Sequence, residues 1–161
     1  MVKSGIWAAA LVVSVAFFVG CSDSPAPLSL GLTNEAVIEG FWVGQGHVTG
    51  GSMVPVGSKF GLSMTVSQVG NDVTGKVLND AGSESDLSGT VNGQNFTFTL
   101  TRGKPCAGTF SGSGTAMNGD TELIGSYSGT DCRGAISAEF KTDIATQREY
   151  LRIRETTRHQ E

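Results

Sequence analysis

Histidine and cysteine are scarce in this chain, and their scarcity removes several classes of function. Only two histidines and three cysteines occur among the 161 residues. Paired metal ligands, a nucleophile motif and a phosphate-binding glycine loop are all missing from the sequence. His47 lies on the predicted outer face of a strand, and His159 is one of the last three residues. We therefore expect no catalytic residues, no metal and no cofactor, and a protein that is not an enzyme.

Charge is also sparse, because Asp, Glu, Lys and Arg make up 16% of the residues and leave a net charge of −4. A chain of this sign does not offer the basic surface that nucleic acid attracts, so we expect no nucleic-acid partner. Two acidic pairs, Glu84 with Asp86 and Asp120 with Glu122, carry the oxygen ligands of a weak calcium site. Loop carboxylates are more often simply solvated.

One long apolar run is present, over residues 6–18, and it follows Lys3 near the amino terminus. A basic start, an apolar stretch of roughly 7–15 residues and a small residue before the cut are typical of an export signal, not of a membrane-spanning helix. The run closes on Phe18-Val19-Gly20-Cys21, which resembles the lipobox of bacterial lipoproteins. The resemblance implies cleavage before Cys21, lipidation of Cys21 and a membrane anchor made of lipid. An ordinary secretory signal is the alternative.

By the same resemblance, Ser22 after the lipidated cysteine implies sorting to the outer membrane, facing the periplasm or the cell surface. Residues 1–20 are then the signal peptide. Residues 21–36, which include Pro25 and Pro27, form the lipidated amino terminus and a linker. In a bacterium with one membrane, the same signal places the domain on the outer face of the cell.

A helical period is absent between the signal peptide and residue 143, and short stretches with period two take its place. They are separated by Gly, Asn and Asp residues that favour hairpin turns. These stretches lie near residues 37–48, 59–69, 72–79, 86–91, 95–102, 107–117, 122–130 and 135–142. We predict an all-β domain over residues 37–142, an antiparallel meander of about eight strands closed into a small up-and-down β-barrel. A two-sheet sandwich is the alternative, and an outer-membrane barrel is excluded because its apolar face must point outwards.

The apolar face of these strands predicts the barrel interior. Its large side chains would line any ligand cavity, and they are Trp42, Phe60, Met64, Phe96, Phe98, Phe110, Tyr127 and Phe140. Glycines in the same register remove side chains from the interior; they are Gly75, Gly89, Gly112, Gly114 and Gly125. This leaves either a cavity or room for aromatic rings from across the barrel, and the dense packing of protein interiors favours filling. The polar groups that would orient a ligand are Tyr127, Arg102 and Gln68.

Cys106 and Cys132 form an even pair in an exported chain, which predicts a disulfide. The midpoint of their numbers is 119, the centre of the Asn118-Gly119-Asp120 turn. A three-residue hairpin loop there would place the two cysteines directly opposite each other, within disulfide reach. A redox pair or a metal site is disfavoured, because there is no C-x-x-C spacing and no histidine nearby in the sequence.

Gly40-Phe41-Trp42, at the start of the first long strand, is similar to the G-x-W of lipocalins and related calycin barrels, the avidins included. The resemblance implies that Trp42 closes one end of the barrel and that an arginine from late in the barrel stacks over it. Arg133, beside Cys132, matches that arginine through a cation–π contact. No T-D-Y motif is present, so Trp42 as an ordinary core aromatic is the alternative.

Residues 143–161 differ from the rest, because charges of both signs alternate and glycine disappears. A thin apolar stripe predicts a frayed helix or a disordered tail, with a docking segment for an envelope partner as the alternative. Taken together, the chain is expected to be a non-catalytic, lipid-anchored envelope protein whose barrel binds a small apolar molecule or a protein partner. The alternative is a structural or interaction lipoprotein with a packed barrel and no ligand.

Overall fold

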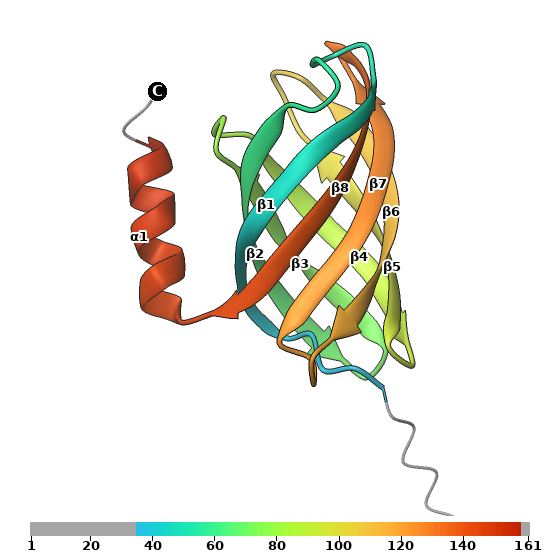
Figure 1. Ribbon diagram of the computed structural model, residues 1–161, viewed down its shortest axis with the longest axis vertical. Coiled ribbons are helices and arrows are strands. Elements are labelled where there is room, and N and C mark those ends of the chain that lie inside the picture. The colour runs from blue at the N-terminus through green and yellow to red at the C-terminus, as the bar shows by residue number, and fades with distance from the viewer. Residues whose placement is uncertain (1–34, 159–161) are drawn as a thin grey trace, which may run out of the picture. The chain divides into compact units, whose positions relative to one another are not determined.

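The computed structural model describes residues 35–158, so the predicted signal peptide, the lipidation of Cys21 and His159 lie outside the described residues. This described part of the chain forms eight strands and one helix, in the order β1 (Gly40–Gly51), β2 (Lys59–Val69), β3 (Asp72–Asn79), β4 (Glu84–Asn92), β5 (Asn95–Arg102), β6 (Gly108–Met117), β7 (Glu122–Asp131), β8 (Gly134–Ala145) and α1 (Gln147–Arg158). Each strand pairs antiparallel with the next, and β8 pairs with β1 to close the barrel (Figure 1). The predicted closed up-and-down barrel is confirmed.

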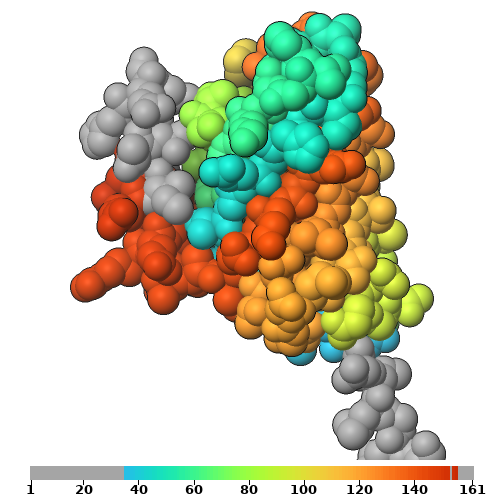
Figure 2. Space-filling model, in the orientation of Figure 1, coloured from blue at the N-terminus to red at the C-terminus, as the bar shows by residue number. Residues whose placement is uncertain are grey.

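The strand bounds follow the period-two pattern closely. The bounds of β2, β3 and β5 coincide with the predicted segments. The first strand begins at Gly40 and ends at Gly51 instead of covering residues 37–48, and β8 continues beyond residue 142 to Ala145. In Figure 2, β1, β8 and β7 lie side by side as teal, red and orange bands. None of the described helices is long and apolar enough to cross a membrane.

Inward-facing glycines let aromatic rings from neighbouring strands lie across the wall. Phe60 pairs with Gly46, Phe98 pairs with Gly112, and a Cβ added at either glycine would overlap the paired ring. The strand register therefore places a large aromatic side chain opposite a glycine, which has no side chain, in each of these pairs. The rings fill the space beside these glycines, as the favoured alternative predicts, and a cavity is nevertheless present in the barrel interior.

One end of the barrel is closed by residues 35–39, which we call the N-terminal plug. The Ala36 amide donates to the Gly93 carbonyl oxygen (2.8 Å), and the Val37 amide donates to Asp120 Oδ2 (3.0 Å). The plug thereby contacts the β4–β5 and β6–β7 turns. Ala36 and Ile38 are 1% and 2% exposed, so they belong to the core. The predicted linker over residues 21–36 therefore extends too far, because its last two residues are part of the fold.

Trp42 and Gln68 hold the plug in place. Trp42 is fully buried, and its indole Nε1 donates to the Ile38 carbonyl oxygen (2.9 Å). The Gln68 side chain accepts a hydrogen bond from the Ile38 amide (2.8 Å) and donates to the carbonyl oxygens of Ala36 and Gly70 (3.0 Å each). The plug thus satisfies its backbone groups while it buries apolar side chains.

The chain beyond the barrel forms α1, which packs against the outer wall. Tyr150 is 3% exposed, and its ring centroid lies 5.0 Å from that of Phe41. Arg154 donates to Glu84 (3.1 Å) and to the Tyr150 hydroxyl (3.3 Å). The charged helix therefore has a buried aromatic contact with the barrel, which the thin apolar stripe in the sequence did not indicate.

Candidate ligand cavity

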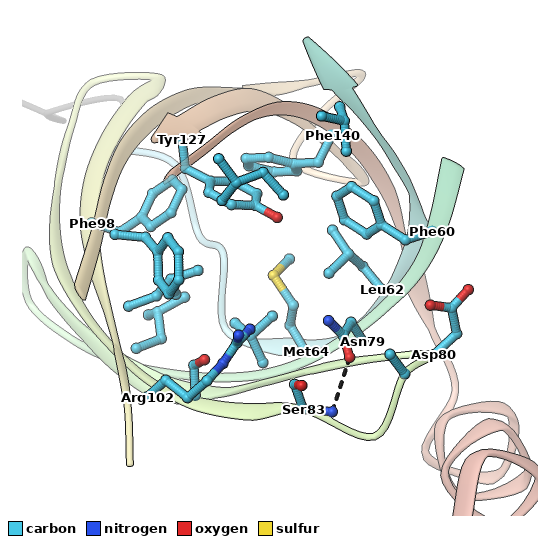
Figure 3. A pocket seen from close by; sticks show the side chains of 18 of the residues that line it. Phe60, Leu62, Met64, Asn79, Asp80, Ser83, Phe98, Arg102, Tyr127 and Phe140 are labelled. Carbon is cyan, nitrogen blue, oxygen red and sulfur yellow. Dashed lines mark hydrogen bonds between the residues drawn. The ribbon is translucent and has the colours of Figure 1, made fainter. Parts of the chain in front are cut away.

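An interior cavity of about 280 Å³ opens at the end of the barrel opposite the plug. Its rim carries residues from the β1–β2, β3–β4 and β7–β8 connections, and Ile38 of the plug lies at its deep end. We call the rim the open end and the plugged side the closed end. Figure 3 shows side chains from strands all around the barrel pointing into this space.

Most of the predicted interior residues line the cavity. They are Phe60, Met64, Phe96, Phe98, Phe110, Tyr127 and Phe140, together with Leu62, Leu87 and Leu100. Trp42 does not line it and lies in the core near the plug. The walls are therefore apolar, and they suit the nonpolar part of a ligand.

The polar groups of the cavity gather near the open end. Arg102 is 16% exposed in its side chain, and its Nη1 donates to Asp131 Oδ2 (2.6 Å). Arg133 donates to the same oxygen from Nη2 (2.9 Å), and its backbone amide donates to Asp131 Oδ1 (2.8 Å). The carboxylate of Asp131 is inaccessible to solvent. Two guanidinium groups thus share one buried carboxylate.

Hydrogen bonds decide the charge state of Asp131. Burial raises the pKa of its carboxyl group, but the hydrogen bonds from the Arg133 side chain and amide, with the charges of Arg133 and Arg102, lower that pKa by more. The net effect keeps the pKa of Asp131 below its ordinary value, so the carboxylate stays ionised beside the two arginines.

Arg102 is held over an aromatic ring but is incompletely hydrogen-bonded. Its guanidinium carbon lies 5.2 Å from the ring centroid of Phe110, a cation–π contact. Its Nε is buried and has no hydrogen-bond partner among the described residues. A buried donor without a partner costs about 1–3 kcal/mol, so the contact with Asp131 leaves the hydrogen bonding of Arg102 incomplete.

Tyr127 brings a hydroxyl group to the same cavity. Its ring packs edge-on against Phe110, with 6.2 Å between the centroids. Burial raises the pKa of Tyr127 to about 12, although the nearby Arg102 charge lowers it in part. The hydroxyl therefore stays protonated at neutral pH and can donate a hydrogen bond.

Two predicted roles are wrong because of where the strands place the residues. Arg133 lies at the open end, next to Asp131, whereas Trp42 lies at the closed end, so the predicted stacking of Arg133 on Trp42 does not occur. Gln68 holds the plug and does not line the cavity, so it does not orient a ligand. Arg102 and Tyr127 do line the cavity, as predicted.

The predicted disulfide between Cys106 and Cys132 is present, with a Cα–Cα distance of 5.2 Å. Its register differs from the prediction, because Met117 pairs with Glu122 and the β6–β7 loop has one more residue than expected. The shifted register means that the two cysteines are not directly opposite each other. Both also lie just outside the paired strands, since β6 begins at Gly108 and β7 ends at Asp131. They link the β5–β6 loop to the β7–β8 turn at the open end. A carboxylate oxygen of Asp131 lies within 4.8 Å of both sulfur atoms, which is close enough for the three to share a metal ion. The two sulfur atoms are, however, already bonded to each other.

The other polar residues considered in the sequence lie on the outside. His47 faces Glu139, 3.4 Å from Nε2 to Oε2. The acidic pairs have partners, since Lys76 lies between Glu84 (3.4 Å) and Asp86 (2.5 Å). In the second pair, Glu122 forms an ion pair with Lys141 (2.7 Å), whereas Asp120 accepts the hydrogen bond from the Val37 amide of the plug.

Sequence reasoning missed the polar side chains of the β3–β4 connection. Asn79, Asp80 and Ser83 line the cavity near its rim, and Asn79 Oδ1 accepts a hydrogen bond from the Ser83 amide (2.9 Å; Figure 3). The sequence could have indicated them, because every second hairpin connection of a meander lies at the same end of the barrel. The β3–β4 connection therefore belongs to the same rim as the β1–β2 and β7–β8 connections.

No family model, no curated protein and no solved structure matches the chain. Function has to be inferred from the cavity and its side chains.

Proposed function

We propose that this chain is a non-catalytic, lipid-anchored protein of the bacterial cell envelope whose barrel binds a small apolar molecule. The observation that carries the proposal is the cavity of about 280 Å³, with apolar walls, a plug at one end and an opening at the other. Unfilled apolar space is costly, because the lining side chains lose contacts. A ligand in the cavity restores those contacts and stabilises the folded state.

A small molecule suits this site better than a protein partner does. The apolar side chains lie inside the wall, where a folded partner has no access, while the outward strand positions carry mainly Ser and Thr. A role without a ligand, in binding a protein or supporting the envelope, becomes the better explanation only if the cavity binds nothing.

The binding test uses the exported Cys21→Ser form and phenylnaphthylamine, a neutral dye that fluoresces in apolar surroundings. We expect a saturable rise in fluorescence at one dye per protein. Met64 points into the cavity (Figure 3), so Met64→Trp should abolish the rise. Ser67→Trp is the matched control, because Ser67 is an exposed residue of the same strand. No saturable binding by the parent protein, or equal loss in both variants, would contradict the proposal.

The anchor is proposed from the lipobox resemblance, since Cys21 lies outside the described residues. The described chain enters the barrel at the closed end, so a tether before residue 35 leads to the plug and not to the rim. Cys21→Ser should move the protein from the membrane fraction to the soluble fraction. A variant that stays with the membranes would argue against lipidation.

A further inference from the structure

We infer that the ligand is a small carboxylic acid, with its apolar chain in the cavity and its carboxylate bound to Arg102 near the open end. The inference rests on the proposed function, since it names the class of ligand for the same cavity. The inference goes beyond the binding of an apolar molecule, because it gives the ligand a negative charge and a specific contact with Arg102.

The position of Arg102 is the first support. Its side chain is mostly buried, lines the cavity and points into the barrel together with the Tyr127 hydroxyl (Figure 3). A wall that served only apolar molecules would gain nothing from a guanidinium group there, because burying a charge is costly and the ion pair with Asp131 leaves the Nε donor without a partner among the described residues.

The charge count at the open end is the second support. Arg102, Arg133 and Lys59 are the cationic residues of the cavity lining, and Asp80 is the acidic one. Asp131 adds one negative charge through its contacts with both arginines. Three positive charges against two negative ones leave a net charge of +1, which one anionic group neutralises.

The hydrogen bonding of Arg102 is the third support, and it selects a carboxylate. Nη1 is bonded to Asp131, whereas Nε has no partner among the described residues and almost no accessible surface, so a ligand reaches it after a rotation of the Arg102 side chain. Nε and Nη2 form one edge of the planar guanidinium group, and a carboxylate can accept two parallel hydrogen bonds from such an edge. The protonated hydroxyl of Tyr127 is a further donor at the same cavity.

The size of the cavity limits the apolar part. Ligand cavities typically span about 300–1,000 Å³, so a cavity of about 280 Å³ is slightly smaller than that range. A short, unbranched acid fits this volume better than a phospholipid with two chains. Decanoate is a suitable probe, and methyl decanoate is its uncharged match, which also represents an esterified acyl chain.

The experiment measures how well each probe displaces phenylnaphthylamine from the exported Cys21→Ser protein at neutral pH. Hydrogen bonds to a charged group typically improve binding by about tenfold or more, so decanoate should bind at least about tenfold more tightly than methyl decanoate. Arg102→Gln should remove that difference and leave methyl decanoate unchanged. Lys59→Gln is the control for general charge attraction, because it removes one cation of the same rim without removing the contact with the carboxylate, and it should reduce the difference much less than Arg102→Gln does.

Each outcome decides between the inference and the proposed function. Equal binding of decanoate and methyl decanoate by the parent protein overturns the carboxylate inference but leaves the apolar cavity function standing. An equal effect of Lys59→Gln and Arg102→Gln overturns the specific contact with Arg102. Failure of the dye itself to bind overturns both. If Arg102→Gln does not fold, Arg102→Gln with Asp131→Asn removes both charges of the pair and gives the same readout.

Discussion

The two ends of the barrel are built from different interactions. At the closed end, backbone amides of the plug donate to turn residues, and the buried side chains of Ala36, Ile38 and Trp42 fill the space. At the open end, two arginines share Asp131, and the loops are joined by the bridge between Cys106 and Cys132. One end therefore has a packed core, while the other has charges and a covalent link.

This difference suggests how a small barrel keeps a cavity. Side chains that fill the space stabilise the closed end, so no room for a ligand remains there. The open end gives up part of that packing. A disulfide stabilises it without occupying the interior, because the bridge mainly restricts the unfolded chain. The cavity is thus located where covalent restraint replaces packing.

The largest change in the free energy of unfolding is expected from a substitution in the core of the closed end. Trp42→Ala should lower the free energy of unfolding by about 3–5 kcal/mol, because a fully buried indole is lost. Urea denaturation followed by circular dichroism measures the change. Trp42→Phe is the control that keeps a ring but loses the hydrogen bond to Ile38, and it should cost less. A loss below about 1 kcal/mol for Trp42→Ala would show that the closed end is not a core.

The second largest change in the free energy of unfolding is expected when the disulfide of the open end is removed. Replacing both Cys106 and Cys132 with Ala should lower the free energy of unfolding by about 3.5 kcal/mol, given a sequence separation of 26. The same urea titration gives the number. The variant should also bind phenylnaphthylamine less tightly, because the loops around the rim are no longer joined. Stability and dye affinity equal to those of the parent protein would contradict this account of the open end.

The smallest expected effect depends on pH. Because the pKa of Asp131 is lowered in the folded protein, its carboxylate contributes stability above the ordinary aspartate pKa of about 3.9. That contribution is lost as the pH falls through the lowered folded-state pKa. Asp131→Asn should therefore be less stable than the parent protein near neutral pH, and the two should converge in acid. Thermal unfolding at a series of pH values tests this; a constant difference down to strong acid would be evidence against it.

The barrel was predictable because its strands alternate so regularly. Phe96, Phe98 and Leu100 oppose a row of threonines, and the structure buries those three residues as the alternation predicts. The ends of β1 and β8 were less predictable, because Gly50, Gly51 and residues 143–145 continue the ladder without a clear alternation. Hydrogen bonding to a neighbouring strand extends these strands beyond their apolar pattern.

The sequence predicted most of the residues that line the cavity, but it did not predict which end of the barrel holds Arg133 and Gln68. Strand direction alone argues against Arg133 stacking on Trp42, because β1 and β7 run the same way and these residues lie near opposite ends of those strands. The plug was missed because its hydrogen bonds join Ala36 to Gly93 and Val37 to Asp120, contacts far apart in sequence that no local pattern reports.

The even number of strands has a mechanical consequence. The described chain enters and leaves the barrel at the closed end, where Phe41 of β1 pairs with Ala145 of β8. Tension between these two points pulls the neighbouring strands apart at one end of their shared ladder. After the plug is released, the load reaches the β1–β8 hydrogen bonds one after another, starting from that pair. The barrel therefore has a defined seam that opens by unzipping, directed from the plug towards the rim.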